Sequence, residues 1–285
     1  MLQKLIKMDN ISDSERAIAQ YIIDNKEKVL HMTIHQLARE TYSSNPTIIR
    51  FCRKLGMDGF RQFKIVLASE LERHYDELYP VDVNMPFREK ESSMDIARRI
   101  SELSQQTLLD SSSMLTEKSL NEAASILEAS RMTYLFAVGD SMIRAASFQN
   151  KMLKINRPVQ LSNFLNEQGY HAFNAGKEDC AIFITYQGGH ADFIEYASMM
   201  RDKGVKQIAI TSEAEGMLAK LCDVVLPLPV SETGASKIAT FSSQVAIDYV
   251  LNVLYSCVFE RQYDNNLKFK NDGDQYVKRI SSSRS

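Results

Sequence analysis

Cysteine and long apolar runs are both scarce in this 285-residue sequence. The four cysteines lie far apart and none forms a C-x-x-C pair, which argues against a zinc ribbon or a redox motif. Isolated thiols of this kind favour a reducing compartment, so we expect a cytoplasmic protein. The longest uncharged apolar run has 11 residues, between Asp248 and Glu260. That run is too short to span a bilayer, so no membrane segment is expected.

Low-complexity tracts and internal repeats are absent as well, and the first ten residues have no apolar core typical of a signal peptide. Hydrophobic residues make up 44% and charged residues 25% of the chain, as in ordinary globular proteins. The net charge of −2 hides an asymmetry, because residues 1–75 carry twelve Lys and Arg against nine Asp and Glu. A mildly basic first part on an acidic remainder fits an anionic partner for the first part.

Residues 1–75 show helical patterns only. Ser12–Glu15 and Thr33–Gln36 are capping boxes, in which a hydroxyl and a Glu or Gln side chain each satisfy a free backbone N–H. Ser44 is expected to cap a third helix, and Gly56 is a natural residue to end it. A fourth helix is predicted from Phe60 to about His74.

Two of these predicted helices, Ile34–Glu40 and Asn45–Leu55, are short and joined by a tight turn. This is the arrangement of a helix-turn-helix DNA-binding unit. Apolar spacing of i, i+3, i+4, i+7 on the later helix predicts a buried face made of Ile48, Phe51, Cys52 and Leu55. The opposite face is polar and basic and carries no acid. The candidate DNA-binding residues are Ser44, Asn45, Thr47, Arg50, Arg53 and Lys54.

A recognition helix places its N-terminal side chains on base edges in the major groove. Asn45, Thr47 and Arg50 are therefore candidates for reading bases, since Asn suits adenine and Arg suits guanine. Arg53 and Lys54 are expected to contact phosphate. By periodicity alone, a small helical bundle with a solvated basic face is an equal alternative.

The chain after this unit changes character twice. Prolines and a charged run in residues 77–106 predict a linker that ends in a helix, and residues 107–262 then alternate between helical and β-rich patterns. The expected strands are Tyr134–Val138, Val159–Ser162, Ala181–Tyr186, Gln207–Thr211 and Val224–Leu228. Five strands with crossover helices predict an α/β fold with a doubly wound, five-stranded parallel sheet. The polar tail, 263–285, is expected to fray.

In a sheet of order 2-1-3-4-5, ligands bind outside the C-terminal ends of strands 1 and 3, where the strand order reverses. Strand 1 ends at Gly139–Ser141 and strand 3 at Thr185–His190, both with glycine-containing turns that open helices. Such turns present N–H groups to an anion, although glycines there often serve the turn alone. The candidate ligand-binding residues are Gly139, Ser141, Thr185, Gln187, Gly188, His190, Thr211 and Ser212.

We expect neither a metal site nor a cofactor. His31 and His35 have the i, i+4 spacing of a metal pair, but Thr33 begins a helix between them, so they should not share a helical face. The five histidines do not cluster, and no G-x-S-x-G nucleophile elbow is present. No catalytic residue is therefore assigned.

Residues 44–56, SNPTIIRFCRKLG, followed by GFRQFK at 59–64, resemble the N-terminal signature of RpiR-type transcriptional regulators. The upstream stretch SERAIAQYI at 14–22 also fits, so the resemblance covers residues 1–75 almost continuously. It implies a helix-turn-helix domain at 1–76. The family pairs that domain with a SIS (sugar isomerase) domain of flavodoxin-like strand order, which residues 107–262 resemble.

The resemblance implies a bacterial, non-enzymatic regulator of carbohydrate metabolism genes, acting on operator DNA as a homodimer or homotetramer. A phosphorylated sugar bound to the SIS domain would control its DNA affinity. The SIS strand-3 loop usually reads roughly Ser-x-Ser-Gly-x-Thr, whereas this chain has Thr185, Gln187 and His190 at the hydroxyl positions. Two alternatives stay open: a sugar-phosphate isomerase with an accessory helical domain, using His190 or Glu232 as general base, and a regulator with a decayed ligand site.

Overall fold

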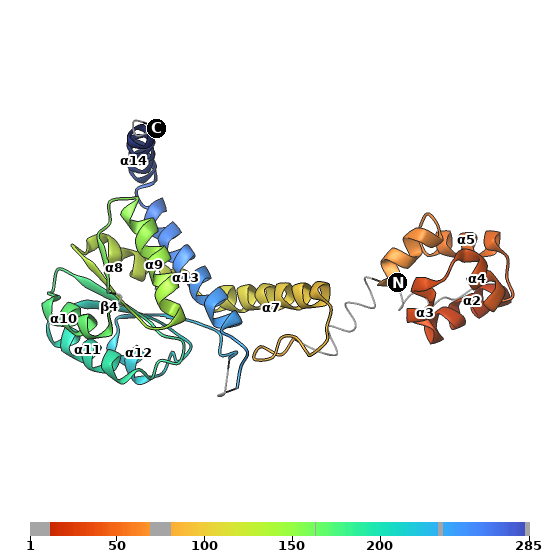
Figure 1. Ribbon diagram of the computed structural model, residues 1–285, viewed down its shortest axis with the longest axis horizontal. Helices are drawn as coiled ribbons and strands as arrows, with labels where there is room; N and C mark the ends of the chain where they lie inside the picture. Colours follow the sequence, from red (N-terminus) through yellow and green to blue (C-terminus); the bar gives the residue numbers. More distant parts are fainter. Residues whose placement is uncertain (1–11, 69–80, 163, 233–235, 283–285) are drawn as a thin grey trace. The chain divides into compact units, whose positions relative to one another are not determined.

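The computed structural model describes residues 12–68, 81–162, 164–232 and 236–282, and Figure 1 shows its ribbon. The chain divides into two compact units, Met1–Pro80 and Val81–Ser285. No helix in the described ranges has the length and apolar character needed to cross a membrane.

The first unit is all helical. Its helices are α2 (Asp13–Asp24), α3 (Lys26–His31), α4 (Ile34–Glu40), α5 (Asn45–Lys54) and a further helix at 60–68. Both predicted capping boxes form, at the starts of α2 and α4. The predicted end of the fourth helix near His74 lies outside the described residues.

One apolar core holds the first unit together. Ile18 and Ile22 from α2, Ile48 and Phe51 from α5, and Phe63 from the helix at 60–68 are each at most 1% exposed. Cys52 is also buried in this core, and desolvation by burial raises the pKa of its thiol to about 11. The predicted apolar face of α5 is therefore confirmed as the face that fixes this helix in place.

The second unit is an α/β domain with a parallel sheet. Its strands are β1 (Thr133–Ala137), β2 (Val159–Leu161), β3 (Cys180–Ile184), β4 (Lys206–Thr211) and β5 (Val224–Pro227), in the order β2-β1-β3-β4-β5. All four strand pairs are parallel, so the predicted doubly wound order is confirmed. The strand bounds differ from the predicted ones by one or two residues.

Helices cover both faces of the sheet (Figure 1). One face packs against α8 (Glu117–Ala129), α9 (Asp140–Leu153) and α13 (Phe241–Glu260), and α7 (Ser93–Met114) packs on α13. The other face packs against α10 (Leu165–Asn174), α11 (Ala191–Asp202) and α12 (Met217–Leu221). All five residues of β3 are buried, as a central strand of a parallel sheet requires.

The helix expected at the end of the linker is α7, which begins at Ser93 because the Ser92 hydroxyl accepts the Asp95 N–H and caps it. The expectation of a frayed tail is wrong, since α14 (Tyr263–Ser282) is helical and leaves the end of α13 (Figure 1). The Asn266 side chain joins α14 to α13 through a 2.9 Å bond to the Phe259 carbonyl, which composition alone did not reveal.

Candidate DNA-binding surface and ligand pocket

The start of α5 is fixed by hydroxyl groups. The Ser44 hydroxyl accepts the Thr47 N–H at 3.3 Å and lies 2.9 Å from the Thr47 hydroxyl, so these two predicted DNA contacts also cap the helix. Arg50 and Arg53 are exposed on the side opposite the core. The sequence therefore placed the polar face of α5 correctly relative to its apolar face.

Asn45 is held by a neighbour that the sequence did not predict. Its amide nitrogen lies 2.8 Å from Nδ1 of His35 on α4. An amide NH2 group only donates, so Nδ1 of His35 accepts and carries no proton in this arrangement. One amide hydrogen of Asn45 is thereby used within the protein, and the side chain is oriented before any DNA contact.

An acid reaches the basic face from another helix. Glu15 on α2 lies 3.2 Å from the Lys54 ammonium. The Ser12 N–H donates to the same carboxylate, and this bond, together with Lys54, lowers the pKa of Glu15. The face of α5 carries no acid of its own, as predicted, but Lys54 already has a partner.

Tyr42 is a further exposed residue of this unit that the sequence reasoning did not select. It stands in the turn between α4 and α5 with φ 50, and it is fully exposed. A positive φ costs a residue with a Cβ about 1–2 kcal/mol. Its ring is a further candidate for DNA contact beside α5. The sequence signal that could have indicated it is a bulky residue in a tight turn, where glycine is favoured.

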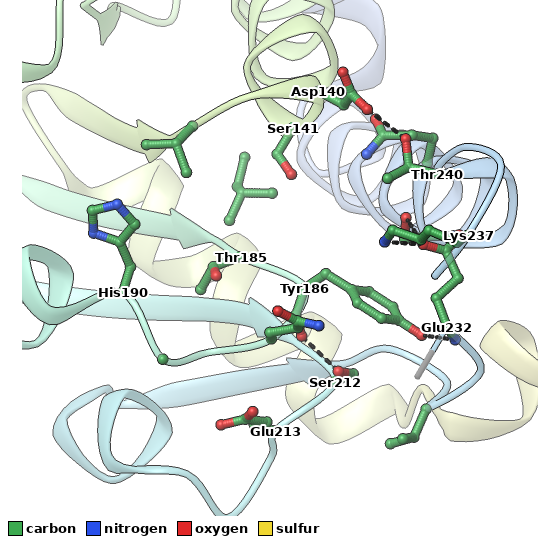
Figure 2. A pocket seen from close by; sticks show the side chains of 17 residues that line it. Asp140, Ser141, Thr185, Tyr186, His190, Ser212, Glu213, Glu232, Lys237 and Thr240 are labelled. Carbon is green, nitrogen blue, oxygen red and sulfur yellow. Dashed lines mark hydrogen bonds and ion pairs between the residues drawn. The ribbon is translucent and has the colours of Figure 1, made fainter. Parts of the chain in front are cut away.

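A cavity of about 770 Å³ opens at the C-terminal ends of β1, β3 and β4 (Figure 2). Five of the eight predicted ligand residues line it: Ser141, Thr185, Gln187, His190 and Ser212. Three do not line it: Gly139, Gly188 and Thr211. The predicted strand order therefore gave the position of the cavity, but not which side chains point into it.

The three residues outside the lining stabilise or permit the local backbone conformation. Thr211 is fully buried, and its hydroxyl accepts the Glu213 N–H at 3.1 Å. Gly139 and Gly188 have φ values of 57 and 64, a region that favours glycine. A Cβ at Gly188 would meet the side chain of Glu213, which lines the cavity, at 3.0 Å.

The cavity presents free hydrogen-bond donors. Ser141 and Thr185 are 8% and 9% exposed, and within the described ranges neither hydroxyl has a protein partner. The amides of residues 187–190 donate to no backbone acceptor in the described part of the chain. These groups lie where α9 and α11 begin, so they suit an anion.

His190 lies at the N-cap of α11. Its ring packs on Phe193 with centroids 4.7 Å apart, and its buried Nδ1 has no hydrogen-bond partner among the residues that the structure describes. Figure 2 shows His190 on the side of the pocket opposite Glu232 and Lys237. The ring itself is half-buried and lines the cavity.

Glu232 carries the most strongly bonded carboxylate of the pocket. Its side chain is fully buried and accepts three donors: the Ser243 N–H at 2.7 Å, the Ser243 hydroxyl at 3.0 Å and the Lys237 ammonium at 2.9 Å. These three bonds fix the carboxylate in place. Lys237 was not predicted, because it comes from a loop after β5 that folds back over the sheet edge.

Tyr186 fastens that loop to the end of β3. Its hydroxyl accepts the N–H groups of Ser231 and Glu232 at 2.8 and 2.9 Å, and it lies 2.8 Å from the Pro229 carbonyl, to which it donates. The walls from β3 and from the loop after β5 are therefore tied by one side chain.

Comparison with known proteins gives a match for each unit. A family model described as "Helix-turn-helix domain, rpiR family" matches residues 1–74, and one described as "SIS domain" matches residues 126–255. The Escherichia coli transcriptional regulator HexR is 29% identical over 233 residues, 81% of this chain and 78% of HexR. The Bacillus subtilis regulator YbbH is 26% identical over 255 residues, 88% of this chain and 87% of YbbH.

Solved structures share the fold. The Vibrio vulnificus NanR protein, solved in complex with ManNAc-6P, covers 98% of both chains with a TM-score of 0.61 and 20% identity. The sugar isomerase domain of an RpiR transcription factor from Sphaerobacter thermophilus covers 63% of this chain and 98% of its own, with a TM-score of 0.56 and 15% identity.

Proposed function

Because this chain is a transcriptional regulator of the RpiR type, we propose that a phosphorylated sugar bound in the cavity of the second unit controls its affinity for operator DNA. One observation carries the proposal: the unpartnered hydroxyls of Ser141 and Thr185 converge with the free amides of residues 187–190. Donors at two helix starts suit a phosphate group. The target genes on this proposal are those of carbohydrate metabolism, read in the cytoplasm.

Different cavity residues suit the phosphate group and the sugar hydroxyls. The phosphate lies against Ser141, Thr185 and the strand-3 loop, and the unpartnered His190 replaces a hydroxyl that other SIS loops supply. The sugar hydroxyls face Gln187 and the Glu232–Lys237 pair. The bound ManNAc-6P of NanR is a ligand of this class and supports the choice.

The DNA-reading part of the proposal rests on α5. Asn45, Thr47 and Arg50 face bases in the major groove, and Arg53 contacts phosphate, with Lys54 sharing its charge between Glu15 and DNA. Helix-turn-helix proteins hold two such helices at the spacing of two half-sites, so the working form is a homodimer or homotetramer.

Catalysis is disfavoured by the state of Glu232. A general base needs a free acceptor position for the substrate proton, and three of the about four acceptor positions of this carboxylate are already bonded inside the protein. The relatives HexR and YbbH are named as regulators. We therefore propose a sensor that binds a sugar phosphate without turning it over.

The test combines ligand binding with DNA binding. Calorimetry would use ribose 5-phosphate, glucose 6-phosphate, glucosamine 6-phosphate and ManNAc-6P, with the unphosphorylated sugars as controls. Fluorescence anisotropy on the DNA upstream of the chain's own gene would follow, with and without each sugar phosphate. Ser141→Ala and Thr185→Val should weaken sugar-phosphate binding, whereas Ser125→Ala, on exposed α8 surface, should not.

Three outcomes decide the matter. Binding of a sugar phosphate with a change in DNA affinity supports the proposal. Turnover of a sugar phosphate would favour the isomerase alternative. Unaltered DNA affinity and no binding by any member of the panel would favour a regulator whose ligand site has decayed.

A further inference from the structure

A line of hydroxyl groups runs from the cavity to α7. The Tyr186 hydroxyl lies 3.1 Å from the Ser231 hydroxyl, which lies 2.8 Å from that of Ser242 on α13. Ser242 in turn lies 2.9 Å from the hydroxyl of Thr107 on α7. Tyr186 lines the cavity, whereas Ser242 and Thr107, 1% and 3% exposed, do not.

The protons of this line have one consistent direction. Thr107 donates its single proton to the Leu103 carbonyl at 2.7 Å, so Ser242 must donate to Thr107. Ser231 must then donate to Ser242, while the Tyr186 hydroxyl gives its own proton to the Pro229 carbonyl and holds Ser231 by accepting its N–H at 2.8 Å. A displacement of Tyr186 therefore moves Ser231, whose hydroxyl donates to the next member of the line.

A second contact joins the cavity rim to the first residues of the second unit. The Ile238 N–H donates to the Asn84 carbonyl at 3.0 Å. Ile238 follows Lys237, whose ammonium is bonded to Glu232 in the cavity wall. Asn84 lies four residues after Pro80, where the first unit ends. A sugar hydroxyl that draws Lys237 away from Glu232 therefore acts next to this bond.

We propose that effector binding is transmitted toward the DNA-binding unit by these two routes, through Tyr186, Ser231 and Ser242 to Thr107, and through Lys237 and Ile238 to Asn84. This proposal rests on the proposed function and specifies how the ligand cavity regulates DNA affinity. Ser242 and Thr107 are positioning residues, because they contact neither the cavity nor the first unit's core. A ligand acts through them only if it binds one arrangement of the line better than the other.

The deciding variant is Thr107→Val, which removes the hydroxyl and nearly preserves the volume, and Thr107→Ser is its matched control because it keeps the hydroxyl. The measured quantity is the ratio of the two dissociation constants for the upstream DNA, with and without the tightest-binding sugar phosphate of the panel. In Thr107→Val we expect this ratio to fall toward unity by about fivefold or more, and in Thr107→Ser we expect it to stay at the wild-type value.

Two further measurements separate transmission from folding. The double variant Thr107→Val/Ser242→Ala removes both hydroxyls of the Ser242–Thr107 bond, so the buried Ser242 donor is not left without its acceptor, and its coupling should be as low as that of Thr107→Val. Sugar-phosphate affinity without DNA and DNA affinity without sugar phosphate should match the wild type in all variants. By linkage, the effect of DNA on sugar-phosphate affinity must fall by the same factor.

The outcomes distinguish the two proposals. A wild-type ratio retained in Thr107→Val and in the double variant overturns the transmission route, while the proposed function stands. A fall of the same size in Thr107→Ser also overturns it, because the hydroxyl would not be what matters. If no sugar phosphate changes the DNA affinity of the wild-type chain, the proposed function itself fails.

Discussion

Glu15 has two roles that conflict at the DNA-binding surface. It completes the capping box that begins α2, and it holds the ammonium of Lys54. The first role needs only a hydrogen-bond acceptor, since Gln36 does the same at the start of α4. The second role needs the negative charge. The two can therefore be separated by one substitution.

Glu15→Gln should tighten DNA binding. The glutamine keeps the cap, and Lys54 is released to contact phosphate, so the slope of log affinity against log salt should steepen by about 0.9 per added phosphate contact. Anisotropy titrations at several salt concentrations on operator and scrambled duplexes would measure it. Glu117→Gln, an exposed acid at the start of α8, is the matched control and should leave the slope unchanged. A slope equal to that of the wild type would mean that Lys54 does not reach DNA.

Arg50→Ala should cost about 1–3 kcal/mol on specific DNA if this side chain reads a base. Arg50 is exposed on α5 and does not belong to the core, so the substitution should leave the fold intact and the loss should report the lost DNA contact. Arg53→Ala should instead weaken operator and scrambled DNA alike. Equal losses on both duplexes for Arg50→Ala would remove it from base reading.

The residue scale also shows where the sequence stopped being informative. The two faces of α5 follow from apolar periodicity, so the exposed positions could be predicted. Thr211 could not be judged, because the end of a strand gives no sign of which way a hydroxyl turns. Tyr186, Glu232 and Lys237 meet through a loop that folds back from β5, and no local pattern encodes such a long-range contact.

At the scale of elements, the loops after β1 and β3 begin helices in similar ways but differ in the space around their glycines. Gly139 and Gly188 both have positive φ, yet a Cβ at Gly139 meets nothing within 4 Å, whereas one at Gly188 meets Glu213 at 3.0 Å and Thr211 at 3.2 Å. The crossover topology was predictable from strand and helix alternation. The crowding behind Gly188 was not.

Gly188→Ala should therefore destabilise the second unit more than Gly139→Ala does. Both variants pay about 1–2 kcal/mol for a side chain at positive φ, and only Gly188→Ala adds the overlap. Chemical denaturation with a probe for the second unit would compare them. Shortening Glu213 in Gly188→Ala/Glu213→Ala should recover part of the difference. Equal losses for the two single variants would contradict the geometry behind Gly188.

At the scale of the whole molecule, the two units have separate cores. The apolar cluster of the first unit shares no residue with the two clusters that cover the sheet of the second. The sequence predicted this division because the helical period gives way to strand and helix alternation. Helices α7 and α14, before and after the strand and helix alternation, were harder to predict because polar helices carry a weak apolar signal.

Unfolding should therefore show two transitions, and a sugar phosphate should shift only one. Ligand at 100 times its dissociation constant should stabilise the second unit by about 2.7 kcal/mol and leave the first unchanged. Calorimetry with and without ligand, read alongside hydrogen exchange of β3 and α5 amides, would assign each transition. A single transition that moves as a whole would instead indicate that the units unfold together.

The labelling rate of the buried Cys52 thiol reports how often the first unit opens around α5. A thiol reagent attacks the thiolate, and burial both shields this sulfur and raises its pKa to about 11. Labelling of Cys52 therefore requires the first unit to open, and the labelling rate is set by the frequency of these openings. Mass spectrometry of the labelled peptide would separate this thiol from the half-buried Cys222 and Cys257. Bound operator DNA should lower the labelling rate of Cys52, so the protection of this thiol from a small reagent measures the fraction of protein bound to DNA.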